Sequence, residues 1–380
     1  MLISHSRWEG KGYYIMKVEV ITRHAITNYG SLLQTIATQQ VISNLGHSCE
    51  IIDYIREDES YYQHEKTILK RKKNWSNSLL KKVLYLAIRQ PESIAAGRKF
   101  ENAQKKYLKL TARYATAKKL KENPPIADVY MTGSDQVWGP VENGSYDDCY
   151  CLSFSEGKKI AYAASFGHTE MTAELSEYYK KWLSKYKYIA VREDSACRIL
   201  NDLGIDTEQV LDPTLLLDSS YWNQYLKPIK YKKYILVYQL HNDKKLGRYA
   251  QQVARAKGLP LVRVSTAFHQ IVRSGRFIWC PEMGEFLSYI KNAECMITDS
   301  FHGTAFAILF NTSFVEVLPN NNTGTRNISI LKLTGLSDRI LKDERDTEKA
   351  MESIDFSYVN GVLKRERMRS LQILKKMIET

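Results

Sequence analysis

The stretch KVEVITRHAITNYGSLLQTIATQQVISNLGHSCEIIDY, residues 17–54, decides the fold class. Its first six residues alternate in the manner of a β-strand, and residues 49–54 form a second strand-like run. Between them, Ser31 to Leu45 carries apolar residues at helical spacing and is closed by Gly46. A strand, a helix and a second strand in this order form the unit of a parallel sheet, so the chain begins as an α/β protein.

Strand-like and helical patterns alternate through the rest of the chain as well. Apolar runs typical of strands recur at 127–132, 159–166, 188–191, 234–238, 261–264, 295–298 and 314–318. Helical patterns lie at 173–186, 194–204, 244–257, 282–292, 302–310 and 361–379. The fold class is therefore α/β, with two Rossmann-like β/α/β halves. Because ligands of such sheets bind at the carboxyl ends of the strands, we expect the site in the cleft between the halves.

This alternation divides the chain into four parts, and one of them holds an insert. We expect a tail at 1–16, an N-terminal Rossmann-like domain at 17–225, a C-terminal Rossmann-like domain at 226–345 and a helical segment at 346–380. An insert at about 60–122 interrupts the N-terminal domain. Its pattern predicts two or three helices, around 65–74, 76–90 and 91–109.

The positive charge of the chain is concentrated in this insert. The 380 residues carry a net charge of +13, and the segment from Glu65 to Glu122 holds 17 Lys and Arg against 4 Asp and Glu. Such a patch indicates a membrane surface or nucleic acid, and the plain alternative is a solvated helical face. Because no nucleic-acid-binding module is recognisable, we expect no nucleic-acid partner and favour peripheral contact between residues 65–122 and an anionic membrane.

Composition excludes several other classes of protein. Hydrophobic residues make up 44% of the chain, yet no run of about 18 apolar residues occurs, which argues against a transmembrane helix. The first 15 residues include Arg7, Glu9 and Lys11 and lack the apolar core of a secretion signal. Six cysteines without a C-x-x-C pattern are typical of thiols in a reducing cytosol. We therefore expect a cytoplasmic protein, with any membrane contact at the inner face.

One polar turn, Ile297–Thr304, follows a predicted strand and opens a predicted helix. A helix N-terminus offers free N–H groups and a partial positive charge, which suit a phosphate. Gly303 allows a ligand to approach the backbone closely, and His302 can carry a proton at neutral pH. The structural alternative is that Asp299 and Ser300 only cap the helix while His302 packs inward.

Two further turns follow strands of the N-terminal half. In Thr132–Trp138, Asp135 is a candidate base or ligand of sugar hydroxyls, and Trp138 is a candidate stacking surface for a sugar. Arg192 ends another strand, where its fork of donors fits a phosphate or a carboxylate. The alternative for the first turn is a plain Gly-Ser-Asp turn with a core tryptophan. The alternative for the turn of Arg192 is a helix-capping box with an interdomain salt bridge.

Motifs of several common enzyme classes are absent. The sequence contains no G-x-G-x-x-G after the first strand, no G-x-x-x-x-G-K-[ST], no H-E-x-x-H and no G-x-S-x-G. Four motifs that are present, in the order Asn28–Gln34, Gly133–Trp138, Val191–Glu193 and Asp299–Thr304, together resemble the polysaccharide pyruvyl transferase family. The similarity extends over about residues 17–340.

The resemblance implies a GT-B-like fold and a reaction. It implies transfer of the pyruvyl group of phosphoenolpyruvate to a sugar of a cell-surface polysaccharide precursor, with a cyclic ketal and phosphate as products. We expect this sugar acceptor to be lipid-linked. The implied reaction requires no metal, and phosphoenolpyruvate is a donor substrate rather than a cofactor. The runner-up is a GT-B glycosyltransferase with a nucleotide-sugar donor, which shares the fold and the cleft.

The resemblance also assigns roles to individual residues. His302 and Asp135 are expected to share the proton transfers. Many family members carry an arginine two residues before the motif histidine, where this chain has Ser300, so Arg326 or Arg339 is expected to supply that cation. The expected donor-binding residues are Arg192, Ser300, Gly303, Thr304, Arg326 and Arg339. The expected acceptor-binding residues are Asn28, Tyr29, Gly30 and Trp138.

Overall fold

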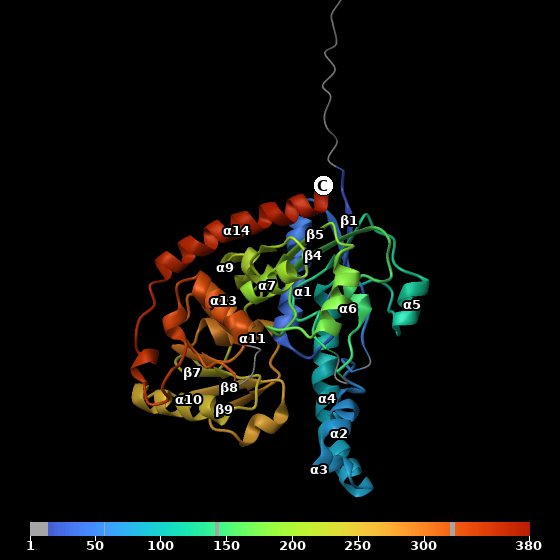
Figure 1. Cartoon of the computed structure of the whole chain (residues 1–380). Coiled ribbons are helices and arrows are strands. Elements are labelled where there is room, and N and C mark those ends of the chain that lie inside the picture. Colours follow the sequence, from blue (N-terminus) through green and yellow to red (C-terminus); the bar gives the residue numbers. More distant parts are fainter. Residues whose placement is uncertain (1–13, 57, 141–143, 320–323) are drawn as a thin grey trace, which may run out of the picture.

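The chain is described by a computed structural model that covers residues 14–56, 58–140, 144–319 and 324–380. Two parallel sheets lie in separate halves of the molecule and are flanked by helices (Figure 1). This arrangement confirms the α/β class and the two Rossmann-like halves. Most of the expected tail, residues 1–13, lies outside the described residues.

The N-terminal sheet has six strands in the order β2-β1-β3-β4-β5-β6, all parallel. Its strands are β1 (Lys17–Ile21), β2 (Ser48–Ile51), β3 (Val129–Thr132), β4 (Lys158–Ala164), β5 (Tyr188–Val191) and β6 (Glu208–Gln209). Its helices outside the insert are α1 (Tyr29–Asn44), α6 (Ala173–Leu183), α7 (Asp194–Asp202), α8 (Pro213–Leu216) and α9 (Ser219–Asn223). The near-continuous burial of β1, β3 and β4 is typical of a parallel sheet covered on both faces.

The C-terminal sheet has five parallel strands in the order β11-β10-β7-β8-β9. They are β7 (Ile235–Tyr238), β8 (Leu261–Ser265), β9 (Arg276–Trp279), β10 (Cys295–Thr298) and β11 (Phe314–Glu316). Its helices are α10 (Lys244–Lys257), α11 (Met283–Lys291), α12 (Phe301–Leu309) and α13 (Thr325–Leu333). The sequence pattern missed β9, because this edge strand is only half-buried, and it missed α13.

The two halves share one hydrophobic core. A single buried cluster runs from the N-terminal sheet through α1 and α8 to α11, α12 and the C-terminal sheet. The last helix, α14 (Phe356–Glu379), begins beside the C-terminal half and ends against the N-terminal sheet (Figure 1). There Ser370 Oγ accepts from the Leu211 backbone N–H at 3.1 Å, and Lys158 Nζ donates to the Ile378 carbonyl at 2.7 Å. The expected C-terminal helical segment therefore contacts both halves of the molecule.

The insert forms four helices: α2 (His64–Arg71), α3 (Lys73–Ser76), α4 (Leu79–Tyr107) and α5 (Ala117–Glu122). The helix boundary expected at residue 91 is wrong, because α4 continues through Pro91. The first part of α4 packs against α2, and its second part buries Ala96 and Phe100 in the shared core. Figure 1 shows α2, α3 and the start of α4 projecting from the body of the molecule as a hairpin. Among the described residues, no helix is long and apolar enough to span a membrane.

Candidate functional site

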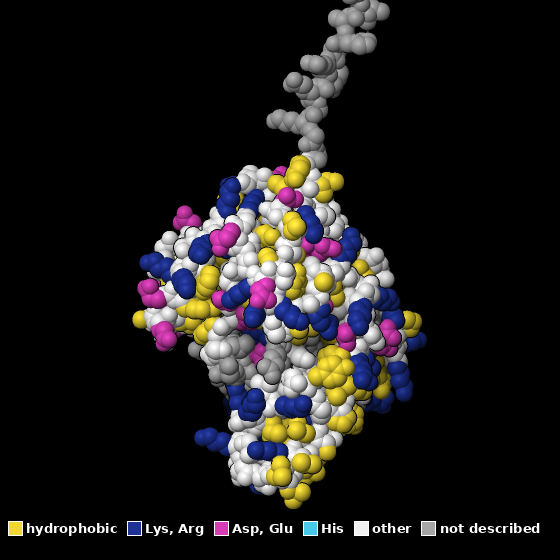
Figure 2. Space-filling view, turned by 90° about the vertical axis from the view of Figure 1, so that its right-hand side faces the viewer, with side chains coloured by type: hydrophobic (Ala, Val, Ile, Leu, Met, Phe, Trp, Pro, Cys, Tyr) yellow, Lys and Arg dark blue, Asp and Glu magenta, His cyan; other side chains and the backbone are white. Residues whose placement is uncertain are grey.

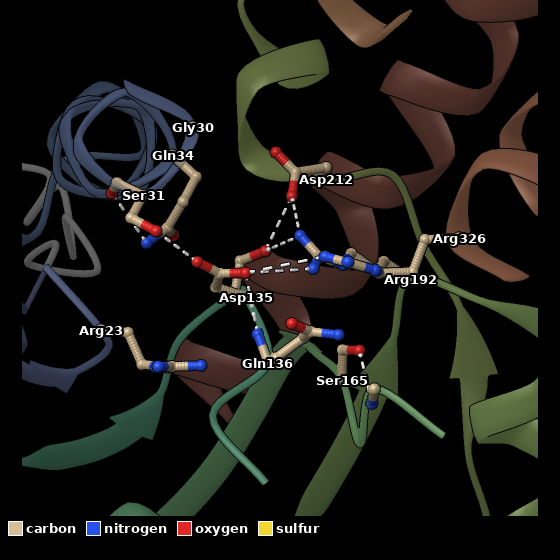
Figure 3. A network of polar contacts seen from close by, with 12 residues as sticks. Arg23, Gly30, Ser31, Gln34, Asp135, Gln136, Ser165, Arg192, Asp212 and Arg326 are labelled. Carbon is tan, nitrogen blue, oxygen red and sulfur yellow. Dashed lines mark hydrogen bonds and ion pairs between the residues drawn. The ribbon is translucent and has the colours of Figure 1, made fainter. Parts of the chain in front are cut away.

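Strand ends of the two sheets converge on one buried polar network (Figure 3). Asp135 lies in the turn after β3, Arg192 directly follows β5, and Asp212 caps the N-terminus of α8. The C-terminal half adds His302 from the first turn of α12 and Arg326 from the first turn of α13. The structure therefore brings together four residues that the sequence singled out, His302, Asp135, Arg192 and Arg326.

Arg192 lies at the centre of this network. Its Nη1 donates to Asp212 Oδ2 at 2.8 Å and to Ser134 Oγ at 3.2 Å, and its Nη2 donates to Asp135 Oδ1 at 3.3 Å. Although burial opposes ionisation, the charges of Arg192 and His302 hold the pKa of Asp135 well below its ordinary value. The side chains of His302 and Arg192 likewise hold the pKa of Asp212 low against its burial. Both carboxyl groups are thus ionised anchors for the guanidinium.

The backbone and side chain of Asp135 are both held by the turn. Its φ of +81° is left-handed, which costs a non-glycine residue about 1–3 kcal/mol unless its surroundings impose it. Here Oδ2 accepts from Ser31 Oγ at 2.5 Å, and Oδ1 accepts from the Gln136 backbone N–H at 2.9 Å. With its lone pairs occupied and its pKa lowered, Asp135 is suited to positioning Arg192 more than to accepting a proton.

Arg326 is the less neutralised cation of the site. The only carboxylate within 4.0 Å of its guanidinium, among the described residues, is that of Asp135, with Nη1 at 3.9 Å from Oδ1. Its Nε is buried and has no hydrogen-bond partner among the residues that the structure describes. Arg326 and Arg192 both pack against the Phe301 ring, at 6.0 and 4.6 Å from its centroid. Burial, and then repulsion by Arg192, lowers the pKa of Arg326 to about 10, so an anion bound here would relieve the repulsion.

His302 is wedged between the two halves of the molecule. Its Nε2 lies 3.7 Å from Asp212 Oδ2 and, within the described part of the chain, is buried without a hydrogen-bond partner. On the other side, a Cβ on Gly30 would lie only 2.1 Å from His302 Nδ1. Gly30 belongs to the first turn of α1, which is capped by Asn28, whose Oδ1 accepts from the Gly30 backbone N–H at 2.7 Å. The imidazole therefore has room beside α1 only because residue 30 has no side chain.

A cavity of about 300 Å³ opens where the turn after β1 meets the helical hairpin and the loop after β8. Its lining includes Arg23, Asn28, Glu59, His64 and Thr266. Arg23 Nε donates to Glu59 Oε1 at 2.5 Å, and its charge also acts on Asp135. The cavity is lined mostly by polar side chains and adjoins the network through Arg23, which suits a hydroxyl-rich ligand.

A family model described as polysaccharide pyruvyl transferase matches residues 28–322. The chain belongs to this family. The matched segment contains Asp135, Arg192, Asp212 and His302, and ends just before α13. Family membership makes the chain a transferase, a pyruvyl transferase of polysaccharide biosynthesis. No curated protein matches the chain significantly.

One of the solved structures that are similar to this chain supports the GT-B-like fold of this family member. The crystal structure of Arabidopsis thaliana UGT89C1 complexed with UDP-L-rhamnose shares 10% sequence identity, with 96% of this chain and 99% of that chain covered and a TM-score of 0.51. A UDP-GlcNAc 2-epimerase of Methanocaldococcus jannaschii, solved in complex with UDP-GlcNAc and UDP, shares 13% identity over 94% of this chain and 99% of that chain, with a TM-score of 0.46. At such identities the likeness concerns the fold alone.

Three residues expected in the site of this pyruvyl transferase are structural. Arg339 is buried away from the network, because its guanidinium donates to the carbonyls of Phe314 and Lys349 at 2.6–3.0 Å. Tyr29 is stacked on a core phenylalanine, and its hydroxyl donates to the Pro281 carbonyl. Trp138 is 1% exposed and its indole Nε1 donates to the Tyr150 carbonyl at 3.2 Å, so it presents no face to a sugar. These three assignments are wrong.

The turn before α12 is also partly structural. Ser300 caps the helix, with its Oγ accepting from the Gly303 backbone N–H at 3.2 Å, as the structural alternative supposed. A Cβ on Gly303 would lie 2.8 Å from Thr298 Oγ1, so this glycine allows close packing within the protein. Thr304 donates its hydroxyl proton to buried Glu316. The structure therefore ties Ser300, Gly303 and Thr304, the three donor-binding residues expected in this turn, to contacts within the protein. His302 is the residue of the turn that joins the network.

Sequence reasoning missed other members of the network. Asp212 stands in the sequence Asp-Pro-Thr, which is typical of a helix start, and its side chain does cap α8 through the Thr214 backbone N–H at 3.0 Å. Its second role, binding Arg192, depends on the end of β5 lying beside it. Arg23 could have been found from its place two residues after β1, since Arg192 likewise stands just after β5.

Proposed function

We propose that this chain transfers the pyruvyl group of phosphoenolpyruvate to two hydroxyls of one sugar in a cell-surface polysaccharide precursor. The products are a cyclic ketal and phosphate. The observation that carries the proposal is a pair of guanidinium groups that pack against one phenylalanine beside a buried histidine. One belongs to buried Arg192 and the other to partly buried Arg326. The donor has a phosphate and a carboxylate, and two forked cations match two such anions.

Arg192 and Arg326 would divide the two anionic groups between them. Arg192 is held in place by Asp212 and Asp135, so the position of its positive charge is fixed before an anion arrives. Arg326 is only weakly neutralised by Asp135. Since burial and mutual repulsion already destabilise its charge, it gains the most from a bound anion.

His302 would carry the proton that ketal formation requires. In the first step its proton goes to the methylene carbon of the donor, while one sugar hydroxyl adds to the neighbouring carbon and returns its own proton to the imidazole. In the second step the carbon–oxygen bond to phosphate breaks, the second hydroxyl adds to the same carbon, and its proton leaves with the phosphate. Asp135 takes no proton in this scheme and acts as a positioning residue.

The acceptor would enter through the polar cavity beside Arg23. Asn28 and Glu59 line this cavity and offer an amide and a carboxylate to hydroxyl groups. Asn28 also caps α1, the helix that His302 contacts, so a sugar bound here would lie next to the proton donor. This keeps Asn28 as an acceptor-binding residue and gives Gly30 a different role, that of making room for His302.

Phosphate release from phosphoenolpyruvate tests the proposal, with lipid-linked and soluble sugars as acceptors. We expect His302→Gln to reduce turnover about 100-fold or more, because it removes the proton donor and keeps the size of the side chain. We expect Arg326→Lys to raise KM for phosphoenolpyruvate, because a point charge cannot form a fork. Arg248→Lys is the matched control, since Arg248 lies on α10 and forms an exposed ion pair with Glu344.

Ligand-induced thermal stabilisation separates the proposal from the nucleotide-sugar alternative. We expect phosphoenolpyruvate to raise the melting temperature of the wild type and of Arg248→Lys, and to raise that of Arg326→Lys much less. Stabilisation by uridine diphosphate sugars, with none by phosphoenolpyruvate, would favour a glycosyltransferase and contradict the proposed donor.

A further inference from the structure

The first turns of α4 leave an apolar half-cylinder uncovered. Leu79, Leu80, Val83, Leu84 and Ile88 are 50–78% exposed, and at helical spacing they fall on one side of the helix. The opposite side carries Tyr85, which packs on Trp75 at 5.7 Å and donates to Glu65 Oε2 at 2.6 Å. The amphipathic pattern is thus inverted: the polar contacts face α2, and the aliphatic face points to solvent.

The charge around this face has one sign. Residues 70–82 contain six Lys and Arg and no Asp or Glu. They form the outer end of the hairpin, where hydrophobic side chains gather beside Lys and Arg side chains (Figure 2). A second short segment, η2 (Phe268–Val272), lies beside the hairpin, because Arg89 Nη1 is 3.0 Å from His269 Nδ1. Within η2, Phe268, Ile271 and Val272 are also exposed.

We propose that the hairpin of α2, α3 and the first turns of α4 docks on an anionic lipid surface, with the aliphatic face of α4 inserted among the headgroups. Helices that lie in a membrane interface combine an apolar face with flanking Lys and Arg, as this hairpin does. The proposal rests on the exposed face and its charge, and it stands independently of the reaction proposed above.

Charge and side-chain chemistry favour lipid over other occupants. A second copy of this chain would bring six further cations against the same six, which opposes pairing of the two faces. Single-stranded nucleic acid binds on exposed aromatic side chains, whereas this face is aliphatic. Aliphatic insertion with a cationic border is the combination that a membrane of acidic lipids satisfies.

Docking here would place the membrane near the proposed acceptor cavity. The base of the hairpin lines that cavity, through His64 of α2 and Arg89 and Ser93 of α4. A sugar carried on a lipid at the membrane surface would therefore approach the cavity along the hairpin. This gives the basic insert a role in presenting a lipid-linked acceptor.

Flotation of the full chain with vesicles tests the proposal. The vesicles are phosphatidylcholine with or without phosphatidylglycerol, at low and high salt. We expect flotation with the acidic vesicles at low salt, weakening with salt. The double variant Leu80→Ser, Leu84→Ser and the double variant Lys70→Glu, Lys73→Glu should each reduce the bound fraction by about tenfold or more.

Two matched variants control for general effects of hydrophobicity and charge. Ile126→Ser removes an aliphatic side chain that is 85% exposed outside the hairpin, and Lys118→Glu with Lys119→Glu reverses two charges on α5. Both should float like the wild type. Phosphate release with a soluble acceptor should be the same in all these proteins, so failure of the proposed reaction leaves the flotation result interpretable.

Three outcomes would overturn the proposal. Wild-type protein that stays at the bottom of the gradient with acidic vesicles excludes docking. Flotation of the Leu80→Ser, Leu84→Ser variant at the wild-type level excludes insertion of α4. Light scattering that shows a wild-type dimer and a monomeric leucine variant assigns the apolar face to a second copy of the chain.

Discussion

An alanine at position 30 tests whether His302 acts from its place against α1. The new Cβ would lie 2.1 Å from Nδ1 and 2.5 Å from Cγ of the imidazole, whereas ordinary contacts begin at 3.4 Å. The ring must therefore move by more than about 1 Å, and a misplacement of this size costs about 100-fold in turnover. The overpacking costs about 1–3 kcal/mol of stability, which the higher helix propensity of alanine offsets by about 0.5–1 kcal/mol. The variant should thus stay folded and lose activity.

The matched control is the same substitution at Gly361, another helical glycine. A Cβ there would meet only Arg365 Nη1, at 3.8 Å. Phosphate release from phosphoenolpyruvate and thermal unfolding are measured for both variants. Gly361→Ala should keep the wild-type turnover. Wild-type turnover in Gly30→Ala, with the fold intact, would refute the reasoning, because His302 would then not depend on the space beside α1.

Three further variants follow from buried groups outside the proposed reaction. Burial, with repulsion from Asp299, raises the pKa of Glu316 to about 8, against about 4.3 in the unfolded chain. Wild-type stability therefore falls as pH rises between these values, and thermal unfolding should show the advantage of Glu316→Gln growing from pH 5 to about pH 8 and levelling off above it. Arg339→Met should destabilise the fold by about 2–4 kcal/mol in denaturant titrations and leave KM for phosphoenolpyruvate unchanged, since Arg339 binds backbone carbonyls. Trp138→Phe loses one hydrogen bond and should lower stability by about 1 kcal/mol in the same titrations without changing KM for the acceptor.

The sequence predicted the parts of the site that follow directly from strand ends. Asp135, Arg192 and His302 each come shortly after an apolar run, and the carboxyl ends of parallel strands share an edge. The same rule could not separate Arg326 from Arg339, because neither directly follows a strand. Only the tertiary arrangement shows that Arg326, on α13, points to the network, whereas Arg339 donates to the Phe314 carbonyl at the start of β11.

Aromatic residues and a proline were the least predictable from the sequence. Tyr29 and Trp138 combine a large apolar body with one polar atom, so the same side chain suits a sugar platform or a core position. The choice depends on whether a carbonyl lies within reach inside the fold, as those of Pro281 and Tyr150 do. A helix boundary was expected at residue 91, but α4 continues through Pro91, with its first part against α2 and its second part in the shared core.

Arg192 and Arg326 differ in how closely carboxylates neutralise their charge. This difference bears on Ser300, which stands two residues before the motif histidine. Ser300 cannot bind an anion by charge, and its Oγ is already used to cap α12. Phe301, the next residue, packs against Arg192 and also against Arg326, which comes from α13. Where the family resemblance leads us to expect an arginine at position 300, this chain instead brings a cation to the Phe301 ring from α13. Arg192 has three carboxylates within 4.0 Å, those of Asp135, Glu193 and Asp212. Among the described residues, Arg326 has one, at 3.9 Å, so we infer that Arg326 supplies the missing positive charge to the donor.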